Sequence, residues 1–399
     1  MKYSELKTPS YIVQEGALIK NLTILRRVEE EAGCKVLLAE KAFSMFRVYP
    51  LIADYLAGTT ASGIFEARLA HEEFRSGANP HPENHVFEPA FKPDEMRELC
   101  KIADHIYFNS LAQLEAHRAV WEPFVKAGKM KTALRINPEH STQEGHAIYD
   151  PCRPGSRLGI RREKMPERLP EGVSGLHFHT LCEQGFEPLA ETFRSVEAHF
   201  APYLGEASWI NLGGGHHITR DDYDVDGLIE LIKEIKEKWQ VEVYLEPGEA
   251  IALNAGTLIT RVLDIVETSD LPTLILDASA ACHMPDALEM PYTPPLAGAL
   301  ESRGGTETAP EPCGEGVWVR LASRTCLSGD VIGYYRLPAM PEIGDILTFG
   351  DMAIYSMVKN NTFNGMALPD IVLEHDSLNE DRFELVKRFG YEDFKGRLS

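Results

Sequence analysis

The stretch KVLLAEKAFS, residues 35–44, holds the feature that decides the fold. Its apolar residues 36–39 predict a buried strand, which ends on the charged pair Glu40 and Lys41. Side-chain alternation along a strand turns Lys41 back toward the core, where an unpaired ammonium group is costly to bury. Taken alone, this lysine favours a side chain that extends past the strand end to water. The alternative is a lysine whose amine serves a bound ligand.

Strand-like segments of the same kind recur up to residue 246, and amphipathic helical segments such as 225–239 separate them. Eight parallel strands that alternate with helices over about 220 residues are typical of a TIM barrel. We therefore predict an α/β fold whose first domain is a (β/α)8 TIM barrel. Its expected strands are 36–39, 58–62, 85–88, 105–109, 131–137, 175–180, 209–213 and 241–246.

The ends of these predicted strands carry side chains and loops that can bind or react. In a TIM barrel the active site forms from the loops at the carboxyl ends of the strands, which converge on one axis. Lys41 is therefore predicted to point into the mouth of the barrel. The groups that end the strands are Lys41, Ser62, Glu88, Asn109, Arg135 with Asn137, His179, the glycines at 213–215 and Glu246.

The pattern changes after residue 251, where short strand-like segments are joined by turns and loops. This loss of helical periodicity indicates a second, all-β domain. We expect a C-terminal β-barrel or β-sandwich that also takes the N-terminal segment. The predicted boundaries are 11–251 for the barrel, and 1–10 with 252–399 for the β domain.

Composition and charge exclude several classes of partner. The formal net charge of -21 over 399 residues is unsuited to nucleic acid or to an anionic membrane, because both require basic patches. The first residues, MKYSELKTPSYIV, contain no apolar signal core, and no apolar run reaches membrane length. The seven cysteines are scattered, without a CxxC pair, which is typical of cytosolic thiols. We therefore expect a cytoplasmic protein whose acidic field attracts cations.

Four strand-end features allow a functional and a structural interpretation. Lys41 in a pocket can acquire a lowered pKa and form a Schiff base. The three glycines at 213–215 can bring backbone N–H groups close to an anion, or can form a tight turn. Glu246 can hydrogen-bond a ring N–H or cap a loop. His179, on the same strand face as His177, can stack on a planar ligand.

A zinc site is a second possibility for this region, because four histidines lie near one another in sequence. We expect no metal, since no cysteine or carboxylate stands at a zinc-like spacing from them. Together the strand-end features fit one ligand instead. A Schiff-base lysine, an anion-binding loop, a carboxylate for a ring nitrogen and a stacking histidine suit pyridoxal phosphate. The four histidines are His177, His179, His216 and His217.

Six motifs occur in order along the chain: AEKAFS (39–44), HFHTLCE (177–183), GGG (213–215), EPGEA (246–250), CLSGD (326–330) and TFNG (362–365). With them the sequence resembles the alanine-racemase-fold pyridoxal-phosphate decarboxylases, which include ornithine, arginine and diaminopimelate decarboxylases. Within that group, EPGEA, SRLGI (156–160) and HMPD…LEMPY (283–292) are most similar to carboxynorspermidine/carboxyspermidine decarboxylases. The resemblance covers nearly the whole chain and implies pyridoxal 5'-phosphate as cofactor.

The resemblance implies a role for each matching residue. Lys41 would hold the cofactor, His179 would stack on its pyridine ring, and Glu246 would pair with the pyridine nitrogen. Cys326 would be catalytic, as the group that protonates the product. Cys326 and Asp330 would reach into the site of the partner subunit, so that a homodimer would share its active sites. The implied phosphate contacts are Gly213, Gly214, Gly215 and Tyr355, and the implied substrate contacts are Glu249, Asp286 and Asp330.

Glu246 selects the reaction that the resemblance implies. A carboxylate beside the ring nitrogen favours its protonated form, and a pyridinium ring is a strong electron sink for the charge left by departing CO2. Racemases of this fold carry an arginine there, so decarboxylation is favoured. Glu249 stands where ornithine-type enzymes carry an arginine after EPG, and a carboxylate there suits the ammonium of a long cationic substrate. The implied substrate is a small carboxylated polyamine, carboxynorspermidine or carboxyspermidine, in polyamine biosynthesis.

Two alternatives stay open. One is another basic amino-acid decarboxylase of the same fold, for diaminopimelate, ornithine or lysine, although Glu249 counts against diaminopimelate. The other is a non-catalytic pyridoxal-phosphate-binding homologue, against which the presence of Lys41, Cys326 and Asp330 together counts. Glu40 is a charge where these decarboxylases often carry an uncharged residue. On a strand it should face the helices, opposite Lys41, and the sequence offers no reason for a carboxyl group there.

Overall fold

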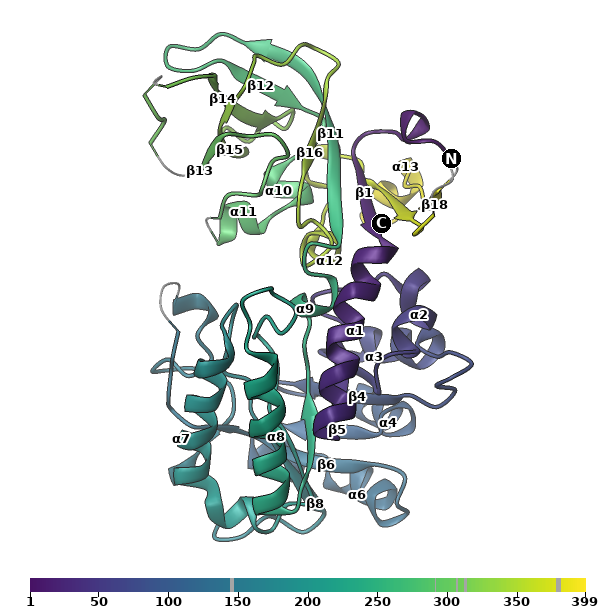
Figure 1. Cartoon of the computed structure of the whole chain (residues 1–399). Helices are drawn as coiled ribbons and strands as arrows, with labels where there is room; N and C mark the ends of the chain where they lie inside the picture. Colours follow the sequence, from purple (N-terminus) through teal and green to yellow (C-terminus); the bar gives the residue numbers. More distant parts are fainter. Residues whose placement is uncertain (144–146, 291, 306–307, 312–313, 378–381) are drawn as a thin grey trace. The chain divides into compact units, whose positions relative to one another are not determined.

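The computed structural model describes residues 1–143, 147–290, 292–305, 308–311, 314–377 and 382–399. It divides into two compact units, which we call the barrel unit (Lys20–Ile251) and the β unit (Met1–Ile19 with Ala252–Ser399) (Figure 1). Cys313, and Pro291 of the LEMPY segment, lie outside the described residues. Among the helices of these ranges, none combines the length and the apolar character needed to cross a bilayer.

Eight parallel strands close into a barrel in the barrel unit. Each strand pairs with the next in chain order, and the last pairs with the first, with Tyr244 opposite Lys35. The predicted (β/α)8 TIM barrel is confirmed. The barrel strands are β2 (Lys35–Ala39), β3 (Gly58–Ala61), β4 (Glu83–Glu88), β5 (His105–Phe108), β6 (Lys131–Asn137), β8 (Val173–His177), β9 (Trp209–Asn211) and β10 (Glu242–Leu245), and the short β7 (Ile160–Arg161) pairs with β6.

Amphipathic helices alternate with these strands, and α8 shows why they form. The Asp224 side chain accepts a hydrogen bond of 2.8 Å from the Gly227 N–H at the helix start, and the buried residues Leu228, Ile232 and Ile235 recur at helical spacing. The helices are α1 (Glu15–Ala32), α2 (Tyr49–Ala53), α3 (Ile64–Glu73), α4 (Pro93–Ile102), α5 (Leu111–Ala116), α6 (Arg118–Lys126), α7 (Phe186–Leu204), α8 (Val225–Trp239) and α9 (Glu249–Ala252).

Large side chains from five strands fill the barrel interior. The cluster contains Leu37, Tyr107, Ala133, Trp209 and Tyr244, all with no exposed surface. Gly175 of β8 makes room for Trp209, because a Cβ at this position would lie 2.1 Å from the indole ring. The barrel is thus a packed core rather than a pore, which leaves the carboxyl ends of the strands as the place for a site.

A mixed nine-stranded sheet forms the β unit, in the order β13-β15-β14-β12-β11-β1-β17-β18, with β16 also paired to β11. The expected β domain that includes the N-terminal segment is confirmed. Its strands are β1 (Ser10–Gln14), β11 (Gly256–Val266), β12 (Thr273–Leu276), β13 (Glu301–Gly304), β14 (Val317–Ser323), β15 (Val331–Leu337), β16 (Ile346–Phe349), β17 (Asp370–Glu374) and β18 (Phe383–Lys387). Four short helices accompany them: α10 (Ala280–His283), α11 (Asp286–Glu289), α12 (Ser356–Lys359) and α13 (Tyr391–Lys395).

The strand β1 lies in the centre of this sheet, antiparallel to β11 and parallel to β17. Residues 11–19, which the sequence predicts to belong to the barrel, lie in the β unit, and 11–14 form part of β1. The reason is that Tyr11, Ile12 and Val13 point to both faces of the strand and are all buried. A strand that is apolar on both faces requires cover on each, which a central place in the sheet provides.

Candidate active site

A cavity opens at the carboxyl ends of the barrel strands, and it brings together Lys41, His179 and Glu246 from separate strand ends. Lys41 lies in the turn after β2, His179 follows β8 and Glu246 follows β10. The sequence predicts these three residues on one rim of the barrel because each follows the end of a parallel strand. The lining residues are Ala39, Lys41, Thr60, Ala61, Ser62, Phe87, Arg135, His177, His179 and Glu246.

The amine of Lys41 is held in an environment that favours its neutral form. Its side chain is exposed to the cavity, yet barrel atoms surround it on the other sides. This burial lowers the pKa of the Lys41 ammonium, the Arg135 guanidinium lowers it further, and the carboxylate of Glu246 opposes both. A lysine with a lowered pKa is a nucleophile that can react with a carbonyl group.

Glu246 is a buried carboxylate held by the side chains of Asn211, His177 and Thr60. It is 6% exposed, its Oε1 accepts a hydrogen bond of 2.8 Å from Asn211 Nδ2, and its Oε2 lies 3.2 Å from His177 Nε2. Burial alone would raise the pKa of Glu246, but its contact with His177 and its further hydrogen bonds outweigh burial and lower the pKa to about 2. Burial in turn lowers the pKa of His177. Glu246 can therefore stabilise a positive charge that faces it, such as a protonated ring nitrogen.

Arg135 lies on β6, and it is joined by a hydrogen bond to His179, which follows the neighbouring strand β8. Arg135 donates to the His179 carbonyl oxygen at 3.0 Å, and its guanidinium lies 4.4 Å from the centre of the Phe87 ring. Burial lowers the pKa of Arg135 to about 10, so it stays charged at neutral pH. Burial and the charges of Lys41 and Arg135 lower the pKa of His179, so its ring is neutral. From the sequence, Arg135 is expected at a strand end, without a specific role in the site.

The glycine loop is constrained by packing as well as by the anion site expected of it. Gly213 and Gly215 have φ angles of 73° and 82°, and a Cβ on Gly214 would lie 2.0 Å from the Glu246 carbonyl oxygen. The Gly213 N–H donates to Asn211 Oδ1 at 2.8 Å, and the Gly214 N–H donates to Nδ1 of the His179 ring at 3.0 Å. Of the three N–H groups, the one on Gly215 has no acceptor among the described residues.

The four histidines of the sequence analysis each have a separate partner in this unit. His217 Nε2 lies 3.0 Å from Glu249 Oε2. Glu249, which stands where ornithine-type enzymes carry an arginine, therefore already has a partner within the barrel unit. That pair is largely buried, with 11% and 12% of the two side chains exposed. The other contacts are His177 with Glu246, His179 with the Gly214 N–H, and His216 with the Tyr223 hydroxyl.

The remaining expected site residues belong to the β unit, in which Cys326 and Asp330 differ in exposure. The Cys326 side chain is exposed, and its backbone N–H donates to Asn364 Oδ1 at 2.7 Å. Asp330 is 2% exposed and accepts hydrogen bonds from Ser279 Oγ (2.7 Å), the Ala281 N–H (3.1 Å) and Thr325 Oγ1 (2.5 Å). Asp330 therefore joins the start of α10 to the loop that carries Cys326.

Tyr355 and Asp286 also have structural contacts within the β unit. Tyr355 has a φ of 51°, and its carbonyl oxygen accepts the N–H groups of Val358 and Lys359 at the start of α12. The Asp286 carboxylate forms an ion pair with the Lys359 ammonium, which also lies 2.7 Å from Glu289 Oε2. This lysine could not be predicted as the partner of Asp286, because the two residues stand 73 positions apart in the chain.

The structure explains why a carboxyl group stands at position 40. It is fully buried, and its Oε1 accepts a hydrogen bond of 2.8 Å from the hydroxyl of Tyr49, the first residue of α2. Burial raises the pKa of Glu40 well above its usual value, which shifts this carboxyl group toward its neutral form. Glu40 thus packs on the helix side while Lys41 faces the cavity.

Comparisons with known proteins place these features in a family. The model of the "Pyridoxal-dependent decarboxylase, C-terminal sheet domain" family matches residues 11–353. A carboxynorspermidine/carboxyspermidine decarboxylase of Campylobacter jejuni is 39% identical over 399 residues, which is 100% of both chains. A carboxyaminopropylagmatine decarboxylase of Synechocystis is 39% identical over 398 residues, 100% of this chain and 97% of the relative. A crystal structure of the C. jejuni carboxynorspermidine decarboxylase complexed with norspermidine superposes with a TM-score of 0.88, at 37% identity, over 98% of this chain and 100% of that chain.

Proposed function

Because the chain belongs to the family of pyridoxal-dependent decarboxylases, we propose that it removes CO2 from carboxynorspermidine, carboxyspermidine or both, and so forms norspermidine or spermidine. The observation that carries this proposal is the 39% identity to the C. jejuni carboxynorspermidine/carboxyspermidine decarboxylase over the whole length of both chains. In this proposal the enzyme acts in polyamine biosynthesis in the cytoplasm.

The groups that line the cavity fit pyridoxal 5'-phosphate. Lys41 offers an amine whose pKa is lowered, Glu246 offers a carboxylate whose pKa is about 2, and His179 offers a neutral ring. We propose that Lys41 holds the cofactor, that Glu246 keeps the ring nitrogen protonated and that His179 lies on the ring. When bound, the cofactor supplies an electron sink for the negative charge left by departing CO2.

For the phosphate group we propose the glycine loop together with Tyr355. Gly215 supplies the N–H group that the described residues leave without an acceptor, whereas the N–H groups of Gly213 and Gly214 orient the loop. Arg135 adds a fixed positive charge at the cavity, because its pKa of about 10 keeps it protonated. An arginine at this place helps to balance the negative charge that Glu249 brings in place of the usual arginine.

The acidic residues Glu249 and Asp286 are proposed to bind the ammonium groups of the polyamine. The identity to the Synechocystis relative favours a second candidate substrate, carboxyaminopropylagmatine. Agmatine ends in a planar guanidinium, whereas spermidine and norspermidine end in compact ammonium groups, so the two substrate types need different donor geometry at the far end of the site. The carboxylates that recognise this end decide between them.

Cys326 and Asp330 are proposed to complete the site of a partner subunit in a homodimer. The exposed thiol of Cys326 is suited to return a proton to the product carbon. The buried carboxylate of Asp330 holds the loop of Cys326 through the hydroxyl of Thr325. Each dimer would then contain two equivalent sites, each with residues from both chains.

The test is a competition among substrates with identification of the amine products. The purified protein is offered carboxynorspermidine, carboxyspermidine, carboxyaminopropylagmatine, diaminopimelate, ornithine and lysine at equal concentration. We expect norspermidine and spermidine as the main products, and aminopropylagmatine if the second candidate is correct. Lys41→Ala is the control, and it should lose both turnover and the visible absorbance of bound cofactor. Products of diaminopimelate, ornithine or lysine alone would contradict the proposal, and cofactor absorbance without any product would indicate a non-catalytic carrier.

A further inference from the structure

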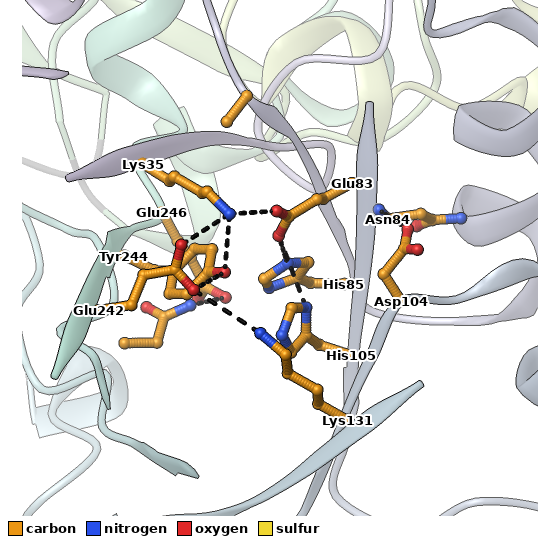
Figure 2. A network of polar contacts seen from close by, with 12 residues as sticks. Lys35, Glu83, Asn84, His85, Asp104, His105, Lys131, Glu242, Tyr244 and Glu246 are labelled. Carbon is orange, nitrogen blue, oxygen red and sulfur yellow. Dashed lines mark hydrogen bonds and ion pairs between the residues drawn. The ribbon is translucent and has the colours of Figure 1, made fainter. Parts of the chain in front are cut away.

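A line of polar side chains runs through the barrel interior from the amino ends of the strands to Glu246. Figure 2 shows its outer part, where Lys35 lies between Glu83 and Glu242 and where His85 lies next to His105. Of its members, only Glu246 is predicted as a site residue from the sequence, because Lys35, Glu83, His85 and Tyr107 stand at the beginning or middle of strands. The line consists of Lys35 (β2), Glu83 and His85 (β4), Tyr107 (β5), Asn211 (β9) and Glu246.

The inner half of the line fixes the orientation of one amide. Asn211 Oδ1 accepts the Gly213 N–H at 2.8 Å, and because that N–H can only donate, the other end of the amide must be the NH2 group. Asn211 Nδ2 donates to Glu246 Oε1 at 2.8 Å and to the Tyr107 hydroxyl oxygen at 2.9 Å. Both hydrogens of the amide are therefore used, one of them on the carboxylate.

The positions of the hydrogens in the outer half follow from matching donors to acceptors in the same way. Since the Tyr107 oxygen accepts from Asn211, its own hydrogen is free to donate to His85 Nδ1, with which it is in close contact. A neutral His85 must then carry its hydrogen on Nε2, which lies 2.8 Å from Glu83 Oε2. The other oxygen of Glu83 pairs with the Lys35 ammonium. With a neutral His85, each hydrogen between Asn211 and Glu83 has one acceptor, so this part of the line has a single arrangement of hydrogens. The Lys35 ammonium at the outer end contacts Glu83, Glu242 and the Tyr244 hydroxyl.

Burial makes this arrangement costly to disturb. His85, Tyr107 and Asn211 have no exposed surface, so water cannot replace a lost partner, and a buried polar group without a partner destabilises the fold. The outer end is different, because 34% of the Lys35 side chain and 24% of the Glu83 side chain are exposed. The line thus connects a partly solvated ion pair to a buried carboxylate.

We propose that Tyr107 and His85 are positioning residues for Glu246. The Gly213 N–H sets which end of the Asn211 amide is the NH2 group, and the Tyr107 hydroxyl, oriented by His85, holds its second hydrogen, so that the amide stays aligned on Glu246. The proposal rests on the proposed function, in which Glu246 faces the ring nitrogen of the cofactor. Without the hydroxyl of Tyr107, one hydrogen of the Asn211 amide lacks an acceptor and the amide can turn away from Glu246.

A second arrangement is possible at the amino ends of the barrel strands, in which Glu83, His85 and His105 bind a metal ion and His85 carries its hydrogen on the other ring nitrogen. Their ligand atoms lie within 4.8 Å of one another, and neither ring nitrogen of His105 has a hydrogen-bond partner among the described residues. A metal on His85 Nε2 would force the hydrogen of that ring onto Nδ1, where it would meet the Tyr107 hydroxyl. The Lys35 ammonium on Glu83 opposes such a cation. The tautomer of His85 therefore distinguishes the two arrangements.

The kinetic test compares Tyr107→Phe with Tyr244→Phe in the cofactor-loaded enzyme. Tyr244 is a control from the same buried cluster, because its hydroxyl bonds Glu242 and the Lys35 ammonium at the outer end of the line, and neither of these bonds is to His85 or Asn211. Tyr107→Phe should lower kcat about tenfold to a hundredfold, as removal of a group that orients a ligating residue usually does, with KM unchanged. The visible spectrum of its bound cofactor should change too. Tyr244→Phe should lose similar thermal stability but keep the wild-type kcat and spectrum.

The second measurement reads the tautomer directly from nitrogen NMR of selectively labelled histidine, with His85 assigned by the signal that His85→Asn lacks. We expect a hydrogen on Nε2 and none on Nδ1. Equal kcat and spectra in the two tyrosine variants, or a hydrogen on Nδ1 of His85, would overturn the proposal. If both variants unfold, the tautomer alone decides. A wild-type protein that decarboxylates none of the substrates would instead contradict the proposed function, and the tautomer would still test the line.

Discussion

At positions 40 and 41 two adjacent ionisable groups face opposite sides of one strand end. Glu40 is fully buried against the helix side and bonded by the Tyr49 hydroxyl, whereas Lys41 opens into the cavity. Burial raises the pKa of the carboxyl group and lowers the pKa of the amine. Both groups are therefore shifted toward their neutral forms, and a neutral Glu40 does not compete for the charge of Lys41.

The raised pKa of Glu40 predicts a pH-dependent effect of Glu40→Gln on stability. The folded state keeps the Glu40 proton to a higher pH than the unfolded chain, so the free energy of unfolding falls as pH rises above the unfolded pKa of about 4.3. The slope is about 1.4 kcal/mol per pH unit until the folded pKa is reached. Glutamine does not titrate, so Glu40→Gln should gain stability relative to wild type across this window. Chemical denaturation at several pH values measures the difference.

The control for this prediction is Glu237→Gln, which changes an exposed carboxylate on α8 in the same unit. Its difference from wild type should stay constant with pH. Parallel stability curves for Glu40→Gln and wild type would show that Glu40 is charged in the folded state, and that burial does not govern its titration.

A second residue-scale prediction concerns Glu249→Gln. The change removes one charge that is held by His217 at 3.0 Å, and a charge-assisted contact to an ammonium contributes about 1.5–3 kcal/mol. We expect KM for the carboxylated polyamine to rise by roughly tenfold to a hundredfold, while the affinity for pyridoxal phosphate changes little. Steady-state kinetics and cofactor titration measure the two effects. Glu234→Gln, an exposed change on α8, is the control, and an equal loss for cofactor and substrate would remove Glu249 from polyamine binding.

Residues that end strands could be placed from the sequence, and their hydrogen-bond partners could not. Lys41, His179 and Glu246 were predictable because period-2 alternation and the parallel barrel rule fix where a strand end points. Asn211 and Arg135 were passed over as partners, because a partner is defined by the register between strands rather than by spacing along one of them. The same limit applies to Lys359, whose contact with Asp286 joins distant parts of the chain.

At the scale of elements, strand centres were predicted better than strand ends. The segment 131–137 matches β6 in full, whereas 175–180 and 209–213 extend beyond β8 and β9. In both cases the apolar pattern continues past the last residue of the strand, as at the fully buried Phe178, whose N–H still donates to the Asn211 carbonyl oxygen. Burial by the loops at the barrel mouth imitates the pattern of a strand, so periodicity alone cannot show where pairing stops.

The glycine loop after β9 supports a prediction on packing. A Cβ at Gly214 would lie 2.0 Å from the carbonyl oxygen of Glu246, so Gly214→Ala must displace either the loop or the end of β10. Overpacking of this kind costs about 1–3 kcal/mol. Because the displaced backbone carries Glu246, we expect a lower melting temperature together with weaker cofactor binding. Thermal denaturation and cofactor titration measure both.

Gly77→Ala is the matched control for the loop, since a Cβ there would meet nothing within 4 Å. It should leave both quantities close to wild type. If Gly214→Ala behaves like Gly77→Ala in both measurements, a methyl group fits at position 214, and packing does not require a glycine there.

At the scale of the whole molecule, the proposed catalytic residues are divided between two units of the chain. Lys41 and Glu246 belong to the barrel unit, whereas Cys326 and Asp330 belong to the β unit. Of the second pair, Cys326 has the exposed side chain, so it is the residue to test for action in another subunit. A two-fold interface is isologous, and each dimer would contain two equivalent sites.

Complementation between two inactive variants tests this shared-site homodimer. Lys41→Ala and Cys326→Ala should each be nearly inactive, because each removes one group from both sites of its own dimer. After gentle dissociation and mixing in equal amounts, about half of the dimers should be hybrids. Each hybrid has one site with both defects and one site with neither, so activity should recover to roughly a quarter of wild type per chain. Differently tagged chains and native mass spectrometry measure the fraction of hybrids. Recovery that follows this fraction requires Lys41 of one chain and Cys326 of the other in one site, whereas no recovery despite confirmed exchange would mean that each site is built from a single chain.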